Sequence, residues 1–438
     1  MLGLYSLLWR LAMPLVLARL WLRGRKEPGY RQHWHERLGL YRRRAANDEP
    51  PTIWVHAVSV GETRAAEPLV DALLKQYPLS RIVLTHMTPT GRATGRQLFA
   101  KHGARLVQSY LPYDTTAMVD RFITHFEPRL CILMETEVWP VLIDVCGRRK
   151  IPVVLANARL SERSLRKALR LGALMRQAAR GITLVAAQTE ADAERVRSLG
   201  VAKVAVTGSI KFDVVVPPAA LATGAQLRGQ IGARPVLLCA STREGEEELI
   251  LDAFSRAQAS LPAGALLLLV PRHPQRFDDV QAMVAARGLG CQRRTALAQP
   301  GAIVAPSTQV LLGDSMGEMF AYYAACDCAF IGGSLLPLGG QNLIEAAALG
   351  KPVLIGEHTF NFAQVTEDAL AAGGALRVAD ADDLMRQAAR LLADDAARGA
   401  MGRQALAFAN QHRGATRRTL DLLPDLLPAS VFDAGAAG

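Results

Sequence analysis

Residues 330–356 restrict the fold of this chain more than any other stretch, and they read FIGGSLLPLGGQNLIEAAALGKPVLIG. Their apolar start predicts a buried strand, and two glycine pairs then predict a tight loop. Gln341-Asn342 can cap a helix over residues 343–349, which Gly350 separates from a second buried strand at 351–355. This order is a βαβ unit, whose helix N-terminus attracts anions such as phosphate, although a tight turn in any α/β protein explains the glycines equally well.

The rest of the chain repeats this α/β rhythm in two halves. Apolar stretches alternate with helical ones, so we expect two parallel sheets with covered faces. Residues 214–235 contain paired prolines and mark the domain boundary. The further strands that we expect are 52–58, 81–85, 106–108, 130–134, 153–156, 182–187, 204–206, 236–240, 266–270 and 310–312. The expected helices include 64–75, 246–257, 320–325, 380–392, 397–411 and 416–423.

Length, cysteine content and charge narrow the class of protein. The 438 residues are enough for two or three domains with sizeable cores. Six scattered cysteines lack the spacing of a zinc site and are too few for a disulfide scaffold, so we interpret them as reduced cytosolic thiols. The formal charge is +11, and residues 1–44 hold ten Lys/Arg against two Glu. Because the remainder is nearly balanced, we do not expect a nucleic-acid-binding surface.

The N-terminal residues 1–22, MLGLYSLLWRLAMPLVLARLWL, have about the length of one bilayer span. Arg10 would cost roughly 2.5–3.5 kcal/mol at a bilayer centre, and Pro14 interrupts a helix. A secretory signal would carry its charge earlier and a small-residue cleavage site later. The tryptophans and the basic residues 23–26 suit a membrane interface. We expect an anchor on the inner face of a membrane; whether it spans or lies on the bilayer is open, and a helix docked on the protein itself is the alternative.

Polar residues follow several expected strands of the first half, and parallel strands bring their carboxyl ends to one edge of a sheet. Glu62 stands at a strand-to-helix junction, but its spacing from Ser59 also matches a capping box, so a structural and a catalytic role are equally supported. Glu135 directly follows a strand, whereas surface solvation explains Glu137. Lys211 offers a cation at the same edge, with a solvated linker lysine as the alternative.

The second half carries similar residues after its strands. Arg272, His273 and Arg276 follow a very apolar strand and supply cations where a ligand phosphate would lie, unless they form an exposed basic turn. A second Ser-x-x-Glu pattern, from Ser241 to Glu244, predicts a capping box. Glu345, one turn inside the helix of the opening stretch, can accept ribose hydroxyls or can merely favour the helix dipole.

The motifs of the whole chain, taken in order, resemble those of the 3-deoxy-D-manno-octulosonic acid (Kdo) transferases. They are RLWLRGRK, VSVGET, MTPTG, LPYD, METEVWP, NARLS, TGSIKFD, the S-T-x-EGEEE block, PRHP, GDSMGEM, FIGGSL with GG-N…E, and HTFNF. The resemblance implies an α/β GT-B fold, in which two Rossmann-like domains face a central cleft behind an N-terminal membrane-anchor segment. It implies an anchor over 1–26, an acceptor-binding domain over 27–214, a CMP-Kdo-binding domain over 215–412 and a helical tail over 413–438.

The same resemblance implies transfer of Kdo from CMP-Kdo to a lipid A precursor, lipid IVA, with inversion, at the cytoplasmic side of the cell inner membrane. It implies Glu62 as general base and Glu135 and Lys211 as groups that stabilise the transition state. The CMP contacts that it implies are Pro271, Arg272, Met316, Gly317, Glu318, Asn342, Leu343, Ile344 and Glu345. It implies no cofactor and no metal, and we find no convincing DxD-like metal motif. The implied partners are the donor, the anionic lipid acceptor and the membrane surface.

Two departures from the family pattern concern the donor side. Gln341-Asn342-Leu343 stands where the family usually has His-Asn-Pro, and Arg243 stands where it usually has His. A neutral Gln supplies neither the charge nor the proton of an imidazole, so the effect on donor affinity is open. The alternatives are a sugar-nucleotide epimerase or murein-precursor transferase of the same fold, or a non-catalytic membrane-bound carbohydrate-binding protein. The number of Kdo residues transferred and the oligomeric state are also open.

Overall fold

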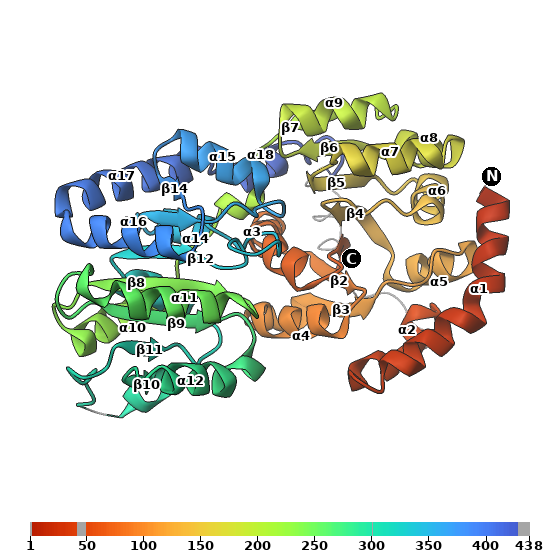
Figure 1. Cartoon of the computed structure of the whole chain (residues 1–438). Coiled ribbons are helices and arrows are strands. Elements are labelled where there is room, and N and C mark those ends of the chain that lie inside the picture. Colours follow the sequence, from red (N-terminus) through yellow and green to blue (C-terminus); the bar gives the residue numbers. More distant parts are fainter. Residues whose placement is uncertain (1, 42–49, 300, 428–438) are drawn as a thin grey trace. The chain divides into compact units, whose positions relative to one another are not determined.

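The computed structural model describes residues 2–41, 50–299 and 301–427, and the chain divides into two compact units (Figure 1). The first unit comprises Met1–Asp213 together with Arg413–Gly438, and the second comprises Val214–His412. Each contains a seven-stranded sheet in which every strand pair is parallel. The α/β class with two parallel-sheet domains is therefore confirmed.

The sheet of the first unit has the strand order β3-β2-β1-β4-β5-β6-β7. The chain runs from β1 outward to β3 and then from β4 outward to β7, so the order reverses between β1 and β4. Ligands of open parallel sheets bind at such a switch point, beyond the carboxyl ends of the strands. The strands are β1 (Thr52–His56), β2 (Arg81–His86), β3 (Leu106–Tyr110), β4 (Pro128–Met134), β5 (Val153–Ala158), β6 (Leu184–Ala187) and β7 (Val204–Val206).

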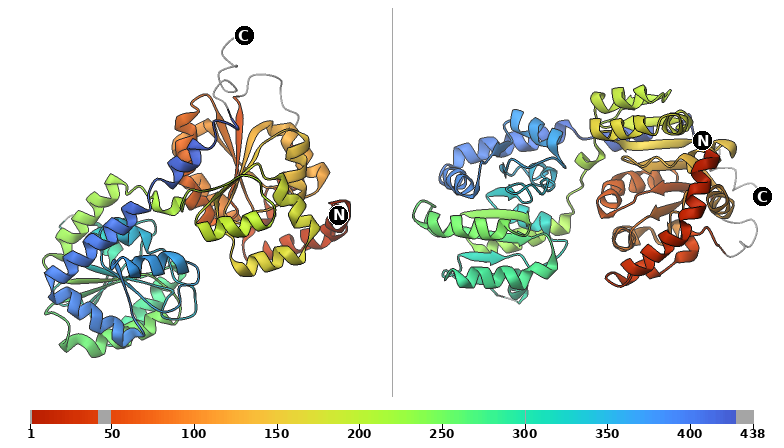
Figure 2. Two further views of the ribbon diagram at one scale, coloured as in Figure 1. Left: turned by 90° about the horizontal axis from the view of Figure 1, so that it is seen from above. Right: turned by 45° about the vertical axis from the view of Figure 1, so that its right-hand side comes forward.

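Side-chain alternation along these strands explains why helices cover both faces of this sheet (Figure 2). Trp54 and Leu133 belong to one buried cluster, whereas Ile53 and Val55 belong to another, because successive residues of a strand point to opposite faces. The helices are α2 (Trp34–Arg37), α3 (Val60–Gln76), α4 (Pro89–Leu98), α5 (Thr116–Phe126), α6 (Pro140–Arg148), α7 (Glu162–Arg170), α8 (Ala173–Gly181) and α9 (Glu190–Ser198), besides α1 and α18.

The N-terminal helix α1 (Leu2–Arg23) is, among the described residues, the one helix long and apolar enough to cross a membrane. It nevertheless contacts the first unit. Leu2 and Tyr5 pack against the buried cluster that contains Trp54, and the rings of Trp9 and Tyr113 lie 5.6 Å apart. One side of this helix is thus packed on the first unit.

The chain returns to the first unit at its C-terminal end. Both carboxylate oxygens of Asp213 accept backbone hydrogen bonds, from Gly414 N and Thr416 N, at the start of α18 (Ala415–Asp421). Leu420 and Leu423 are buried in the cluster that also contains Ile53. The helical segment after residue 412 is thus part of the first unit's core as far as Leu427.

The sheet of the second unit has the order β10-β11-β9-β8-β12-β13-β14, with its switch point between β8 and β12. Its strands are β8 (Val236–Thr242), β9 (Leu266–Pro271), β10 (Cys291–Arg293), β11 (Val310–Leu312), β12 (Cys328–Ile331), β13 (Val353–Ile355) and β14 (Ala375–Arg377). Its helices are α10 (Pro218–Ile231), α11 (Glu246–Arg256), α12 (Phe277–Ala286), α13 (Met319–Ala325), α14 (Ile344–Ala348), α15 (Ala363–Ala371), α16 (Ala381–Ala393) and α17 (Asp395–Gln411).

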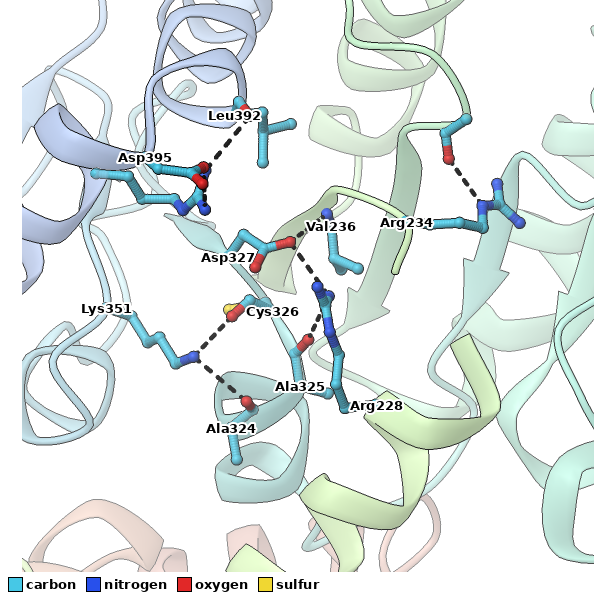
Figure 3. Close-up of polar contacts among 12 residues, drawn as sticks. Arg228, Arg234, Val236, Ala324, Ala325, Cys326, Asp327, Lys351, Leu392 and Asp395 are labelled. Carbon is cyan, nitrogen blue, oxygen red and sulfur yellow. Dashed lines mark hydrogen bonds and ion pairs between the residues drawn. The ribbon is translucent and has the colours of Figure 1, made fainter. Parts of the chain in front are cut away.

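A polar network ties together the amino ends of three of these strands (Figure 3). Asp327 Oδ2 accepts hydrogen bonds from Arg228 Nη1 at 3.1 Å and from Val236 N at 2.8 Å. Lys351 Nζ donates to the carbonyl oxygen of Cys326 at 2.7 Å. These contacts join the starts of β8, β12 and β13, whose opposite, carboxyl ends carry the loops predicted to bind a ligand.

One local prediction in this unit is wrong. The capping box from Ser241 to Glu244 does not form, because Gly245, at φ +89°, is the N-cap of α11 and the Glu244 side chain is 86% exposed. The helix predicted over 343–349 is confirmed as α14, and the predicted capping residue Asn342 accepts the hydrogen bond of Ile344 N at its start through Oδ1.

Candidate active site

Glu62 lies at the switch point of the first sheet, in the first turn of α3, directly after β1. Its Oε2 accepts a hydrogen bond from Val58 N at 2.7 Å. The Ser59 side chain makes no capping hydrogen bond, so the reciprocal capping box is not formed. Glu62 bonds the residue before the N-cap instead, and this contact orients its carboxylate at the carboxyl end of β1.

The surroundings of Glu62 favour its protonated form. Burial is the main cause that raises its pKa to about 8, and the charges of Glu137 and Glu135 raise the pKa further. The hydrogen bond from Val58 N and the charge of Lys211 act in the opposite direction. A carboxyl group that titrates close to neutral pH exchanges protons readily, as a general acid or base must.

Glu135 and Lys211 form an ion pair at the same edge, with 2.8 Å between Oε1 and Nζ. Glu135 directly follows β4, the strand beside β1, and its backbone is in the left-handed region at φ +57°. Such a conformation costs about 1–3 kcal/mol for a residue with a side chain, and such residues are enriched at active sites, where the surrounding structure enforces them. The structure thus brings together the three residues Glu62, Glu135 and Lys211, which are far apart in sequence.

Asn157 holds the segment that carries Lys211. It lies in β5, is fully buried and has a φ of +54°. Its Oδ1 accepts a hydrogen bond from Ile210 N at 3.1 Å, at the start of the 3₁₀ turn Ile210–Phe212. The NARLS motif marks the loop after β5, but it does not predict that Asn157 bonds the turn before Lys211. The one sequence signal for this role was an Asn at a strand end, since Asn tolerates left-handed backbone.

Glu137 is not the solvated surface acid expected from its place in the sequence. Its side chain is 20% exposed, and Oε2 accepts a hydrogen bond from Trp139 Nε1 at 2.9 Å. The same oxygen lies 4.0 Å from Nε2 of the fully buried His56. His56 Nδ1 lies 2.9 Å from Thr85 Oγ1 and 3.1 Å from the carbonyl oxygen of Thr85. Burial, above all, lowers the pKa of His56 to about 3 and raises that of Glu137.

In the second unit, the buried acid Glu246 binds backbone N–H groups of the glycine loop. Glu246, fully buried, accepts hydrogen bonds from the backbone N–H groups of Arg243, Gly333 and Leu335. Gly340 N donates to the carbonyl oxygen of Gly333 at 2.6 Å. The N–H groups of Gly333 and Gly340 are therefore bonded within the protein, so the predicted attraction of an anion to the helix N-terminus would not involve these two groups.

Cationic side chains gather beyond β8 and β9. Arg272 follows β9, and burial together with the charges of Arg272 and Arg243 lowers the pKa of His273, so these three side chains lie near one another. Arg276 differs, because it pairs with Glu247 at 3.4 Å and Asp279 at 3.5 Å. The expected cation cluster thus consists of Arg243, Arg272 and His273, and Arg276 stabilises the loop instead.

The other residues predicted to contact CMP follow β9, β11 and β12 at this same edge. Met316 is exposed, Gly317 has a φ of +83°, and Glu318 pairs with Arg294 at 3.2 Å. Pro271, Leu343 and Ile344 are buried. We therefore expect them to contact a ligand mainly through backbone atoms. Asn342 Nδ2 donates to Glu345 Oε1 at 3.2 Å.

One grouping among the described residues has donor atoms close enough for a metal ion: His33, His35 and Glu36. Glu36, however, already accepts hydrogen bonds from Arg92 and from Tyr110 N. Burial and the charge of Arg92 lower the pKa of His33. A guanidinium that occupies the carboxylate opposes a second cation, so this grouping fits a structural polar network better than a metal centre.

Sequence comparisons identify the family to which this chain belongs. The family model "3-Deoxy-D-manno-octulosonic-acid transferase (kdotransferase)" matches residues 32–214. A 3-deoxy-D-manno-octulosonic acid transferase of Bordetella pertussis is 46% identical over 435 residues, which cover 97% of this chain and 99% of that protein. One of Haemophilus influenzae is 39% identical over 438 residues, with 98% and 99% covered.

Solved structures of low sequence identity share the fold. The UDP-GlcNAc 2-epimerase from Neisseria meningitidis has a TM-score of 0.58 at 16% identity and covers 85% of this chain and 100% of its own. A glycosyltransferase from Rickettsia africae has a TM-score of 0.58 at 12% identity, with 87% and 100% covered. These likenesses confirm the predicted GT-B fold class.

Proposed function

Because the chain belongs to the 3-deoxy-D-manno-octulosonic acid transferase family, and is thus a glycosyltransferase of lipopolysaccharide synthesis, we propose that it transfers Kdo from CMP-Kdo to lipid IVA with inversion. The observation that carries the proposal is the group of Glu62, Glu135 and Lys211 at the switch point of the first sheet. Its members combine a carboxyl group of raised pKa with an ion pair beside it.

In this mechanism Glu62 is the general base. It removes the proton of an acceptor hydroxyl, whose oxygen attacks the anomeric C2 of Kdo from the side opposite the nucleotide. The new O–C2 bond forms as the bond from C2 to the phosphate oxygen breaks, and CMP leaves with the electron pair. A base of pKa about 8 is far stronger than an ordinary Glu, which brings it closer to the pKa of the hydroxyl that it must deprotonate.

Glu135 and Lys211 stabilise charges of the reacting sugar in this step. The positive charge that develops on the sugar ring is stabilised by the carboxylate of Glu135, and the ammonium group of Lys211 attracts the donor's own carboxylate. Their 2.8 Å ion pair holds both groups in place before the donor arrives, so little reorganisation is needed during the reaction.

The second unit binds CMP-Kdo through Pro271, Arg272, Met316, Gly317, Glu318, Asn342, Leu343, Ile344 and Glu345. The cluster of Arg243, Arg272 and His273 supports this assignment, because the phosphate of CMP gains negative charge as it leaves. The permanent charge of Arg243 strengthens this cluster where the family usually has a titratable His.

The acceptor is an anionic glycolipid, and we place the enzyme at the cytoplasmic side of the cell inner membrane. The ten basic residues among residues 1–44 support this placement, since each basic residue near an anionic membrane contributes about 1 kcal/mol of attraction. The first unit, apart from α1, would then bind the acceptor.

Mass spectrometry of the product tests the proposal. Purified protein is incubated with lipid IVA and either CMP-Kdo or a UDP-sugar, and the lipid product is weighed. We expect the mass of lipid IVA to rise by one or more Kdo residues with CMP-Kdo alone. Release of CMP without a heavier lipid, or transfer from the UDP-sugar, would contradict the proposed donor and acceptor.

A further inference from the structure

One face of α1 is docked on the first unit along the whole length of the helix. The residues that are partly or fully buried recur at helical spacing, at positions 2, 5, 6, 9, 12, 13, 16, 17 and 20. Tyr5 hydrogen-bonds to Asp114, whose carboxylate also accepts the backbone N–H groups of Val141 and Leu142 at the start of α6. Trp9 lies against Tyr113. The helix is therefore attached to the body of the protein through specific polar and aromatic contacts.

The opposite face of α1 is an exposed stripe of leucines. They recur every three, four or seven residues, which places them on one side of the helix. Their exposed fractions are 63% for Leu4, 57% for Leu8, 68% for Leu11, 74% for Leu15 and 54% for Leu22. A contiguous apolar stripe of this kind on a water-soluble surface marks an interaction site.

The surroundings of this stripe indicate which partner covers it. Arg10 and Arg19 flank it on either side, and no acidic residue occurs before Glu27. At the C-terminal end of α1, the guanidiniums of Arg25 and Arg31 each lie 4.8 Å from the ring centre of Trp21. Leucines with flanking arginines and an interfacial tryptophan match the boundary between anionic headgroups and acyl chains.

A groove beside α1 continues this surface. It has a volume of about 380 Å³ and lies between α1 and the starts of α5 and α6. Leu2, Leu7 and Val141 form apolar parts of its lining, and Arg10 and Asp144 add charges of opposite sign. A groove that combines apolar and charged side chains suits an amphiphile better than a folded protein partner.

We propose that α1 lies in the plane of the membrane interface, with its leucine stripe in lipid and its other face docked on the first unit, and that it does not cross the bilayer. A helix must devote about 20 residues to a span of roughly 30 Å. All 22 residues of α1 belong to the helix whose one face is docked, so a crossing would detach Tyr5 and Trp9 from Asp114 and Tyr113. The inference rests on the proposed membrane setting and is independent of the transfer reaction.

Vesicle sedimentation tests the leucine stripe. The full chain and the variant Leu8→Glu/Leu11→Glu are mixed with vesicles of phosphatidylglycerol and phosphatidylethanolamine. The matched control is Leu221→Glu/Leu249→Glu, which replaces two leucines that are 42% and 43% exposed in the second unit. We expect the first variant to bind vesicles at least tenfold more weakly and the control to bind like the parent. Equal binding by all three would overturn the assignment of this face. Kdo transfer assayed in detergent should be unchanged in both variants. A loss of transfer in detergent would show that the substitutions disturb folding or the proposed reaction rather than membrane binding.

Cysteine labelling distinguishes a helix in the plane from one that crosses. Gly3 is exposed, and a Cβ added to it would meet no atom within 4 Å, so Gly3→Cys is tolerated; Ala222→Cys in α10 is the control for the cytoplasmic body. Spheroplasts are treated with a membrane-impermeant maleimide, and lysis in detergent shows that both thiols are reactive. We expect neither cysteine to react from outside. Reaction of Gly3→Cys alone from outside would show that α1 crosses the bilayer and would overturn the proposal.

Discussion

Glu246 offers the sharpest test of how the second unit holds its glycine loop. Its Oε2 accepts hydrogen bonds from Arg243 N and Gly333 N, and its Oε1 accepts one from Leu335 N at 2.9 Å. In Glu246→Gln the amide oxygen can keep the first two bonds, but the NH₂ group cannot accept the third. A hydrogen bond to a charged group contributes about 1.5–3 kcal/mol and a neutral one about 1 kcal/mol, so we expect a loss of about 3–5 kcal/mol.

Calorimetry of the full chain measures this effect. For a unit of this size, a loss of that magnitude lowers the unfolding temperature by roughly 6–20 °C. We expect the transition of the second unit to move and that of the first unit to stay, and hydrogen exchange should show faster exchange at Gly333 and Leu335. The matched control is Glu248→Gln, an exposed acid two residues along the same helix, which should leave both transitions in place. A shift of about 1 °C or less in Glu246→Gln would refute the reasoning.

Three further predictions concern the first unit. Lys211→Met removes the partner of Glu135 and the cation that attracts the donor's carboxylate, so kcat/KM should fall about 10²–10³-fold in steady-state assays; an unchanged kcat/KM would contradict its role. Since the base acts when deprotonated and the pKa of Glu62 is about 8, kcat/KM should rise with pH up to about that value. Glu137→Gln removes a charge that raises this pKa, so the midpoint of the profile should move down. An unmoved midpoint would show that Glu137 does not raise the pKa of Glu62. Asn157→Ala frees Ile210 N and should lower kcat while circular dichroism shows a folded chain; full activity would mean that this bond does not position Lys211.

Much of the architecture could be predicted because buried parallel strands leave a direct signal in the sequence. The strand at 328–331 and its neighbours are uninterrupted apolar runs, and the structure has strands there. Capping was less predictable. Ser241 and Glu244 have the right spacing, but the tertiary contact of Glu246 with the glycine loop decides where α11 begins.

The candidate site shows the same limit more clearly. Glu62, Glu135 and Lys211 could be selected because each follows a strand, and strand order brings their loops to one edge. Their mutual distances, and the role of Asn157 in holding the turn before Lys211, depend on contacts between residues about 50 positions apart. The environment of Glu137 could not be predicted either, because it depends on the neighbouring side chains of Trp139 and the buried His56, which no motif records.

The most direct test of the central claim is single-turnover transfer by Glu62→Gln, measured beside the equilibrium binding of CMP-Kdo. The amide keeps the size of the side chain and can still accept the hydrogen bond of Val58 N, but it cannot take a proton. We predict that the rate of Kdo transfer falls at least about 10²-fold, whereas the affinity for CMP-Kdo stays within about twofold. Transfer at the parent rate with intact donor binding would contradict the assignment of Glu62 as the base.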